Sequence, residues 1–466
     1  MRRTVGPLLA VTVALVLADS AVVTLALPDI LRHLDASVGQ VAWVLIAYNL
    51  VLGLGAVPAA MGLARAQPRV LTAVGIAVFA GASAWCAFAD SIEVLIVARC
   101  VQAVGGALTV VGSLELFVSE YGERRGVGVW VTAGVVGTAA GPFAGGLLTE
   151  LISWQAIFVV QVPFAVLAVP AALGARTTVP TTATAPAPAG APTAEEPAVA
   201  PRKRHRPALA ANLTLALVSA ALTAALFLLV LLLVEGWRHS PGTAALTVSV
   251  VPVAALAAAP LARLLRPPPQ VEVAVGCFLV AGGLAALAIP PSAHLAWTIA
   301  PQALVGLGLG LTVDQLTARA MEMRLPRAEH AGWTIGARHL GVVVGLAILT
   351  PVFTADLQDA QEPAQEAVVS IVLDAPLQPQ DKIAVAEALG AALTDQEGQV
   401  PDLAPAFATL DLEPSERPAA AALERDLTGQ LERAATRAFR DSFLIGAGLA
   451  LAAMLVVLVP RRRRVA

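Results

Sequence analysis

Residues 133–163 read AGVVGTAAGPFAGGLLTELISWQAIFVVQVP, and this stretch decides how the whole chain is interpreted. Its first half is apolar, and Gly137, Gly141 and Gly145 recur at every fourth position. Residues with this spacing lie on one face of a helix, where glycine lets a neighbouring helix approach closely. Pro142 removes one backbone donor beside this face and is expected to bend the helix. The pattern predicts a kinked membrane helix with a bare packing face, and inert packing is its simplest interpretation.

The composition indicates a membrane protein. Apolar residues make up 57% of the 466 residues and charged residues 14%, and the mean hydropathy is +0.76. A soluble chain carries about 25% charged residues, whereas many apolar runs here reach the roughly 20 residues that cross a bilayer as a helix. Cys86, Cys100 and Cys277 each stand alone in such a run, which indicates neither a disulfide framework nor a metal site.

Twelve apolar runs, in two groups of six, predict an all-α integral membrane fold. The expected spans are 6–27, 38–62, 70–89, 92–118, 126–149 and 154–174, then 209–234, 243–265, 271–290, 294–318, 330–352 and 442–460. The first run does not resemble a cleaved signal, because it is long, carries Asp19 and lacks a small-residue cleavage pattern. The chain is therefore divided into a six-helix bundle (1–174), a cytoplasmic linker (175–207), helices seven to eleven (208–354), an insert (355–440), and the twelfth helix with a basic tail (441–466).

The basic residues of the short loops predict the orientation, because Lys and Arg concentrate on the cytoplasmic side. One side of the membrane receives Arg2, Arg3, Arg65, Arg69, Arg124, Arg125, the basic run 202–206, Arg263, Arg266, Arg319, Arg324, Arg327 and the run 461–464. The short loops of the other side hold little beyond Arg32 and Arg238. Both termini are therefore expected in the cytoplasm and the insert outside.

Two segments are predicted to lie outside the membrane. Residues 175–207 are rich in Ala, Pro and Thr and then basic, which is typical of a flexible tether. Residues 355–440 hold 16 acidic and 6 basic residues, and runs such as QDKIAVAEALGAAL (380–393) place apolar residues at helical spacing. We expect a small helical extracytoplasmic insert whose last helix continues into the twelfth span. It is either a solvated decoration, or a lid or docking surface for an extracytoplasmic partner over the outward opening.

Charged residues within the predicted spans are functional candidates, because charge is costly in a bilayer. Asp19 lies about nine residues, or roughly 13 Å, from the outer end of the first span, and Arg99 lies about seven residues, or roughly 10 Å, from the same surface. These matching depths allow an ion pair. Burial favours the protonated carboxyl and a nearby guanidinium favours the carboxylate, so such a pair can exchange a proton. A salt bridge that only locks two helices together is the alternative.

Three motifs resemble those of one transporter family. The opening stretch has the form GxxxGPxxGG followed by W-x-x-I-F-x-x-x-x-P, which resembles the fifth-helix signature of major facilitator superfamily drug/proton antiporters. The residues on this signature are Gly137, Gly141, Pro142, Gly145, Gly146, Trp154, Ile157, Phe158 and Pro163. LADSAVVTLALP (17–28) and ARCVQAVGGAL (98–108) resemble the first-helix and fourth-helix patterns of the QacA/EmrB-type members. The resemblance implies proton coupling through Asp19 and Arg99, with Gln102 on the glutamine of the fourth-helix motif.

A second set of polar residues lies in the tenth and eleventh spans. Asp314 and Arg338 both fall within about two turns of the cytoplasmic surface, and GWTIGARHLGVVVGLAIL (332–349) resembles the penultimate-helix pattern of the family. We expect either a cytoplasmic gate or a static brace. His339 has no counterpart in that pattern and is either a titrating group or a packed, hydrogen-bonded one. Glu115 is interpreted as an ordinary interfacial carboxylate.

The chain departs from the family in two places. The family loop G-x-L-A-D-R-x-G-R-R corresponds here to AMGLARAQPR (60–69), which keeps Arg65 and Arg69 as candidate gate residues. Ala64 takes the place of the aspartate and Gln67 that of the second glycine, so the gating role of this loop is left open. QacA/EmrB-type members usually have fourteen spans, whereas this chain has the tether 175–207 where two extra helices would stand.

The sequence thus favours a secondary exporter in which two six-helix bundles rock around a midplane cavity. The resemblance implies that helices one, four, seven and ten line this cavity, that proton influx drives the efflux of a lipophilic small molecule, and that the bacterial cytoplasmic membrane is its location. Candidate substrate contacts are Trp43, Tyr48, Asn49, Gln102 and Gln161. The alternatives are lipid or glycolipid export, and a non-transporting scaffold or sensor. No phosphate-binding GxxxxGK[ST] or HExxH motif occurs, so we expect no enzyme activity, cofactor, metal or nucleic-acid partner, and a monomer among membrane lipids.

Overall fold

The computed structural model describes residues 5–63, 65–175, 208–321, 325–394, 403–408 and 416–459. Every regular element in these residues is a helix, and twelve helices are long and apolar enough to cross a membrane, as expected from the sequence. The predicted tether 175–207 and the substitution at position 64 lie outside the described residues, apart from residue 175.

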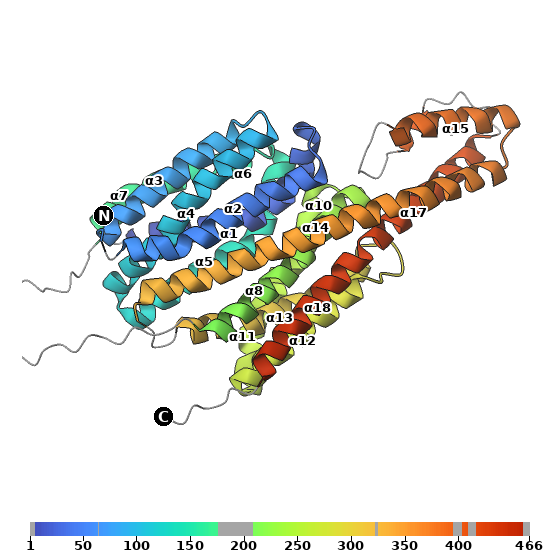
Figure 1. The fold of residues 1–466 in the computed structure, drawn as a ribbon. Coiled ribbons are helices and arrows are strands. Elements are labelled where there is room, and N and C mark those ends of the chain that lie inside the picture. The colour runs from blue at the N-terminus through green and yellow to red at the C-terminus, as the bar shows by residue number, and fades with distance from the viewer. Residues whose placement is uncertain are drawn as a thin grey trace, which may run out of the picture.

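The first six spans form one bundle, which we call the N half (residues 5–175; Figure 1). Its helices are α1 (Val5–His33), α2 (Val38–Gly62), α3 (Pro68–Ala87), α4 (Ile92–Tyr121), α5 (Glu123–Leu151), and α6 (Ala156–Val159) with α7 (Gln161–Gly174) as one span. Serine caps fix where two of them begin: Ser37 forms a capping box with Gln40, and Ser91 accepts a hydrogen bond from the backbone of Val94.

The remaining spans form the C half (residues 208–357 and 439–459). The seventh span joins α8 (Leu209–Thr223), η1 (Ala224–Leu228), α9 (Leu229–Leu231) and η2 (Leu232–Gly236), and the eighth joins α10 (Pro241–Val248) and α11 (Val250–Leu265). They are followed by α12 (Pro269–Leu287), α13 (Ala296–Met321), the first part of α14 (Arg327–Asp374), and α18 (Arg440–Leu458).

The glycine face of α5 packs against α1, as the opening stretch predicts. A Cβ added to Gly137 would lie 2.2 Å from the carbonyl oxygen of Ala14, and one added to Gly145 would lie 2.3 Å from that of Val22. Any larger side chain would push the two helices apart. Helix α5 continues through Pro142 without interruption. This seam fixes the position of α1, which carries Asp19.

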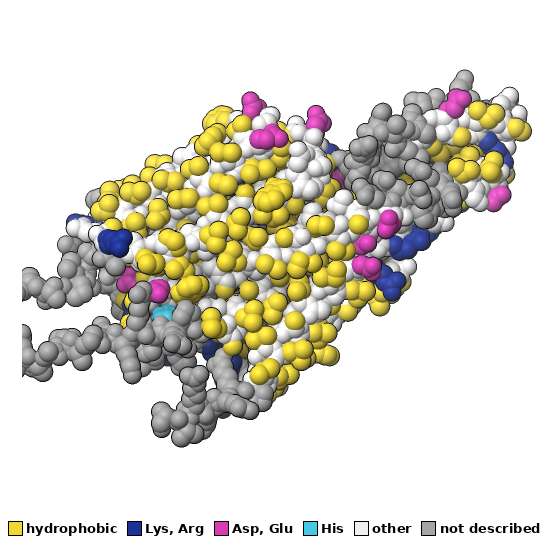
Figure 2. All heavy atoms as spheres, viewed as in Figure 1, with side chains coloured by type: hydrophobic (Ala, Val, Ile, Leu, Met, Phe, Trp, Pro, Cys, Tyr) yellow, Lys and Arg dark blue, Asp and Glu magenta, His cyan; other side chains and the backbone are white. Residues whose placement is uncertain are grey.

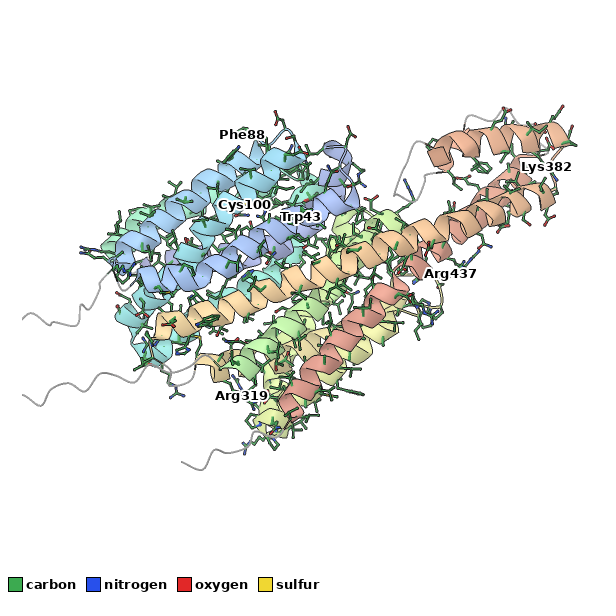
Figure 3. The ribbon with its side chains drawn as sticks, viewed as in Figure 1. Trp43, Phe88, Cys100, Arg319, Lys382 and Arg437 are labelled. Carbon is green, nitrogen blue, oxygen red and sulfur yellow. The ribbon has the colours of Figure 1, made fainter. Side chains whose placement is uncertain are left out.

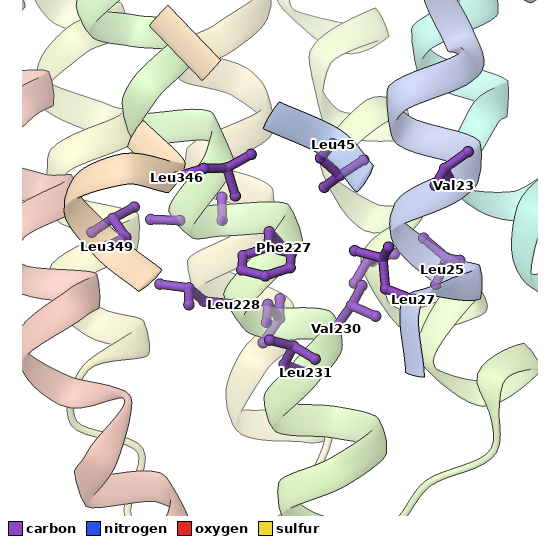
Figure 4. Packing of buried hydrophobic residues seen from close by; sticks show 14 of the residues in the cluster. Val23, Leu25, Leu27, Leu45, Phe227, Leu228, Val230, Leu231, Leu346 and Leu349 are labelled. Carbon is purple, nitrogen blue, oxygen red and sulfur yellow. The ribbon is translucent and has the colours of Figure 1, made fainter. Parts of the chain in front are cut away.

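The two halves meet along α2 and α14 on one flank and along α5 and α10 on another. Glycines again allow the approach: a Cβ on Gly336 would lie 2.9 Å from the carbonyl oxygen of Gly53, and one on Gly146 would lie 2.1 Å from the Cβ of Ala245. Buried leucines and valines fill the junction between α1 and the seventh span, where Leu27 faces Val230 (Figure 4).

Helices α14 and α17 (Arg417–Ala438) continue beyond the bundle and carry a cap with α15 (Pro379–Thr394) and α16 (Ala404–Ala408) (Figure 1). The cap has its own small apolar core, formed among others by Val385, Leu389, Leu423 and Leu427. The insert therefore does not begin at a break near residue 355, because α14 runs unbroken to Asp374.

The surface divides into an apolar flank and two polar ends. Hydrophobic side chains cover the visible flank of the bundle, and charged side chains gather at its ends and on the cap (Figure 2). We call the end at which α1 and α14 begin the basic end; it carries Arg65, Arg69, Arg124, Arg125 and Arg319, the last of which is marked in Figure 3. We call the opposite end the cap end.

Candidate functional site

The N half holds a charged pair deep in its core. Asp19 projects from α1 and Arg99 from α4, and both side chains are 0% exposed. The Nη1 atom of Arg99 donates to the Oδ2 atom of Asp19 in a short charge-assisted hydrogen bond. The structure thus brings together the two residues that the depth argument paired.

Polar side chains of α2, α4 and α7 surround this pair. The Nε2 atoms of Gln102 and Gln161 donate to Asp19 Oδ1 over 3.2 Å and 3.0 Å. Arg99 Nη1 also donates to Gln102 Oε1 over 2.6 Å. The guanidinium lies over the ring of Tyr48, 4.0 Å from its centroid, a favourable cation–π geometry. Asp19 therefore accepts three hydrogen bonds, whereas Arg99 Nη2 has no partner among the described residues.

This arrangement makes the two charges depend on each other. Removing one partner of a buried pair leaves an uncompensated charge and costs about 3–5 kcal/mol. A proton arriving on Asp19 would likewise leave the guanidinium without its counter-charge, so protonation favours a rearrangement of α1 against α4. Such an arrangement is suited to coupling proton exchange to a conformational change.

A cavity with two lobes lies between the halves, close to this pair. The larger lobe, of about 160 Å³, is lined by Val135, Thr138, Ala139, Pro142, Leu222, Leu226, Val251, Pro252, Ala255, Leu256, Ala259, Leu309, Gly310, Val313, Asp314 and Arg338. The smaller lobe, of about 90 Å³, is lined by Leu17, Ser20, Ala21, Thr24, Leu45, Asn49, Thr138, Ser219, Leu222, Thr223, Leu226, Phe227, Arg338, His339 and Val342. The lobes share Thr138, Leu222, Leu226 and Arg338 and so adjoin at these residues.

Asp314 and Arg338 both line the larger lobe, but the described residues include no ion pair between them. The neighbouring His339 bridges the halves instead: its Nδ1 atom lies 2.7 Å from Asn49 Oδ1 on α2. Asn49 Nδ2 in turn donates to Ser20 Oγ over 3.0 Å. His339 is therefore a hydrogen-bonded residue at the interface between the halves.

The structure places one of the five predicted substrate contacts in the cavity. Asn49 lines the smaller lobe, but Tyr48, Gln102 and Gln161 are at most 3% exposed and belong to the cluster around Asp19. Trp43 is 52% exposed and lies on the outer surface of α2 (Figure 3). Helical periodicity gives the face of a helix but not the neighbour that this face meets, so the sequence did not indicate these positions. Helix α4, expected to line the cavity, contributes no residue to either lobe, whereas α1, the seventh span and α13 do.

The other predicted residues lie apart from the pair and the cavity. Gly137, Gly141, Gly145 and Gly146 form helix seams, and among the antiporter-signature residues of α5 only Pro142 reaches a lobe of the cavity. Arg65 and Arg69 are exposed at the basic end, where Arg69 Nε donates to Gln67 Oε1 over 2.8 Å. Glu115 lies toward the basic end of α4, where it interacts electrostatically with Arg327.

Sequence reasoning missed the polar ties that join the halves at their ends. At the basic end, Arg327 Nη2 lies 2.6 Å from Glu123 Oε1, joining the first residues of α14 and α5. At the cap end, Arg32 pairs with Glu235 over 2.9 Å. Glu150 there accepts from Ser240 Oγ over 3.0 Å and from the backbone of Gly242. The sequence shows these as ordinary loop and helix-end charges, with no signal for their partners.

The fold and the site together define a class: a polytopic α-helical membrane protein of twelve spans, with two halves around a central cavity and a buried ion pair beside it. The sequence model of the Major Facilitator Superfamily matches residues 9–350. The chain therefore belongs to the major facilitator superfamily, whose members are transporters rather than enzymes.

Curated relatives match about a third of the chain. The Methylenomycin A resistance protein of Bacillus subtilis is 33% identical over 171 residues, which is 35% of this chain and 36% of the relative. The Tetracenomycin C resistance and export protein of Streptomyces glaucescens is 36% identical over 35% of this chain and 31% of the relative. The multidrug efflux pump LfrA of Mycolicibacterium smegmatis is 37% identical over 33% of this chain and 32% of the relative. The matches thus span only about a third of these relatives.

Solved structures share the fold over almost the whole chain. A bacterial homologue of the human lysosomal transporter Spinster, in an inward-facing and unoccupied conformation, superposes with a TM-score of 0.60 over 98% of both chains at 16% identity. A transporter of the POT family superposes with a TM-score of 0.56 over 75% of this chain and 91% of that chain, at 10% identity. These likenesses support the fold assignment alone.

Proposed function

We propose that this protein is a proton-coupled exporter of hydrophobic or amphiphilic small molecules that works by alternating access. The observation that carries the proposal is the fully buried Asp19–Arg99 pair beside a cavity between two helical halves. A carboxylate and a guanidinium sealed in a membrane helix bundle mark a proton or substrate pathway by default. The names of the curated relatives, which refer to antibiotic resistance and drug efflux, support export as the direction of transport.

Helix α1 connects the proton site at Asp19 with the wall of the substrate cavity. Asp19 faces α4 within the N half, and the adjacent Ser20 lines the smaller lobe of the cavity. A shift of α1 after protonation therefore changes the cavity wall directly. Ser20 is also hydrogen-bonded to Asn49, which contacts His339 of the other half. The same movement thus reaches the interface around which the halves would rock.

The cavity lining supports a lipophilic cargo. Most of the residues of the larger lobe are apolar, and its charged side chains are those of Asp314 and Arg338, whereas the smaller lobe mixes apolar and polar residues. Apolar pockets with a few placed polar groups are typical of small-molecule sites. Arginines at the basic end orient this end toward the cytoplasm under the positive-inside rule. The bacterial sources of the curated relatives support the bacterial cytoplasmic membrane as the location.

The test is transport by the purified protein in liposomes under an imposed pH gradient. The cargo panel consists of ethidium, pyrene-butyrate and a fluorescent phospholipid, which separates drug export from lipid export. We expect gradient-driven movement of at least one small molecule and a loss of at least tenfold in Asp19→Asn. Asp90→Asn is the matched control, because Asp90 is exposed in the loop between α3 and α4. Full transport by Asp19→Asn, or transport without a gradient, would contradict proton coupling, and movement of the phospholipid alone would favour lipid export.

A further inference from the structure

We propose that Arg338 forms an anion subsite at the junction of the two cavity lobes, and that the cargo is an amphiphile with an apolar body and one carboxylate or phenolate. This inference rests on the proposed export function, because it assigns a chemical class to the cargo of the same cavity. Four features of the site carry it.

The first feature is the state of the Arg338 side chain. Its guanidinium forms neither a hydrogen bond nor an ion pair with any described residue, although it lies within the membrane-spanning part of α14. Buried charges in proteins are paired or hydrogen-bonded, because an isolated charge in an apolar medium is strongly disfavoured. A guanidinium offers five donors in a planar fork that matches a carboxylate. An anionic group of the cargo would supply the missing partner.

The second feature is its position. Arg338 is one of four residues shared by the two lobes, together with Thr138, Leu222 and Leu226. A ligand in either lobe can therefore reach the guanidinium. Its immediate neighbour His339 is held by Asn49 across the interface, so the backbone at this point of α14 is fixed against α2.

The third feature is a set of polar groups on one side of the guanidinium. The smaller lobe is lined by Ser20, Ser219 and Thr223 in addition to Asn49 and His339. The Ser219 hydroxyl forms no hydrogen bond to a described residue, so its proton is available to an oxyanion. The other side is apolar, with Val135, Pro252 and Leu256 among the residues of the larger lobe. The polar group of a cargo is thus placed in the smaller lobe and its apolar body in the larger one.

The fourth feature is the location of the acidic side chain. Asp314 lines the larger lobe only and is itself exposed; it attracts Arg338 electrostatically, but the described residues include no ion pair between them. A cationic cargo would require Asp314 as its partner instead. The two charges therefore predict opposite cargo classes, and the geometry favours the arginine because both lobes and the free hydroxyl converge on it.

The test is direct binding of three probes with the same apolar body, namely pyrene-butyrate, pyrene-butanol and pyrene-butylamine. Each probe is titrated against the full-length protein in lipid nanodiscs at neutral pH, and empty nanodiscs are subtracted. A charge-assisted hydrogen bond gives an affinity difference of about tenfold or more. We expect pyrene-butyrate to bind at least that much more tightly than the other two probes. Arg338→Gln should abolish this preference while leaving pyrene-butanol binding unchanged, and Arg338→Lys should restore part of it.

Two further variants make the outcome specific. Ser219→Ala should weaken pyrene-butyrate binding severalfold, because one donor to the oxyanion is lost, and Asp314→Asn should leave the preference in place. Tighter binding of pyrene-butylamine, a preference that survives Arg338→Gln, or no saturable binding of any of the probes would overturn the anion subsite. Pyrene-butyrate binding that depends on Arg338, without transport under a pH gradient, would instead contradict the proposed export function and leave the subsite standing.

Discussion

Each half of this protein contains an aspartate and an arginine within its membrane spans. We call the Asp19–Arg99 set closed, because its charges are in contact and buried, and the Asp314–Arg338 set open, because both residues line the cavity. In the N half, Asp19 and Arg99 are in direct contact, fully buried and surrounded by glutamine and tyrosine side chains. In the C half, Asp314 and Arg338 both line the cavity and attract each other electrostatically, but the described residues include no ion pair between them. A closed pair changes state only when a proton arrives, whereas an open pair is accessible to a cargo. We therefore propose that the proton site lies in the N half and that Arg338 is the part of the cargo site that the C half contributes to the cavity between the halves.

The largest expected difference between the two sets is in stability. Arg99→Met leaves the Asp19 carboxylate buried without its counter-charge, and we expect a loss of about 3–5 kcal/mol in the free energy of unfolding. Arg338→Met removes a cation that forms no hydrogen bond or ion pair with a described residue and whose attraction to the exposed Asp314 is screened, so the loss should be below about 1 kcal/mol. Thermal unfolding of the purified variants in detergent measures both. Equal losses for the two variants would contradict the division into a closed and an open set.

The α1–α5 seam tests whether the closed pair depends on the position of α1. Gly137→Leu would drive a side chain into the backbone of Ala14, where even a Cβ would lie 2.2 Å from the carbonyl oxygen. Overpacking of this kind costs about 1–3 kcal/mol, and we expect gradient-driven transport to fall with it, because α1 carries both Asp19 and Ser20. Gly128→Leu on the same helix is the control, since a Cβ there meets no atom within 4 Å. Equal effects of the two substitutions would show that the seam does not matter.

The closed pair could be predicted from the sequence, and the open one only in part. Asp19 and Arg99 are single charges in apolar runs at matching depths, and a bilayer tolerates such charges only when they meet a partner. The contact partners of Gln102 and Gln161 depend on how α1, α4 and α7 are rotated within the bundle, which helical periodicity does not give. Asp314 and Arg338 also lie at similar depths, but matching depth alone does not bring two side chains into contact.

How helices distant in the sequence pack together could likewise be predicted only in part. The lengths of the apolar runs predicted the twelve spans, because a chain that crosses the membrane must form a helix that hydrogen-bonds its own backbone polar groups. The cavity lining and the ties between the halves depend on which ends of distant helices meet. Glu123 and Arg327 are more than two hundred residues apart, and no local pattern links them.

The Asn49–His339 contact is expected to tie α2 to α14 across the interface between the halves. We expect Asn49→Ala and His339→Ala each to reduce stability, with a coupling energy of about 0.5–1.5 kcal/mol in a double-mutant cycle. The physical reason is the hydrogen bond between Asn49 Oδ1 and the His339 ring, which each substitution removes. The midpoints of thermal unfolding of the unsubstituted protein, the two single variants and the double variant supply the cycle. Strictly additive losses would show that the contact does not tie α2 to α14.

The smallest expected effect on stability concerns the Glu123–Arg327 ion pair at the basic end. Its carboxylate is exposed to solvent, whereas the Asp19–Arg99 pair is buried. The Glu123 side chain is 71% exposed although its carboxylate lies 2.6 Å from Arg327, so water and salt screen the attraction to about 0.2–1 kcal/mol. Arg327→Gln should therefore barely change thermal stability but shift the rate of transport, because the pair must open whenever the halves separate at this end.

The shift in the transport rate should vanish at high ionic strength, while the defect of Asp19→Asn should persist, since the interior pair is shielded from salt. Arg319→Gln, at the same end and outside the ion pairs of the described residues, is the control for lost charge alone. A transport change in Arg327→Gln that survives high salt would mean that this arginine acts through packing rather than through its charge.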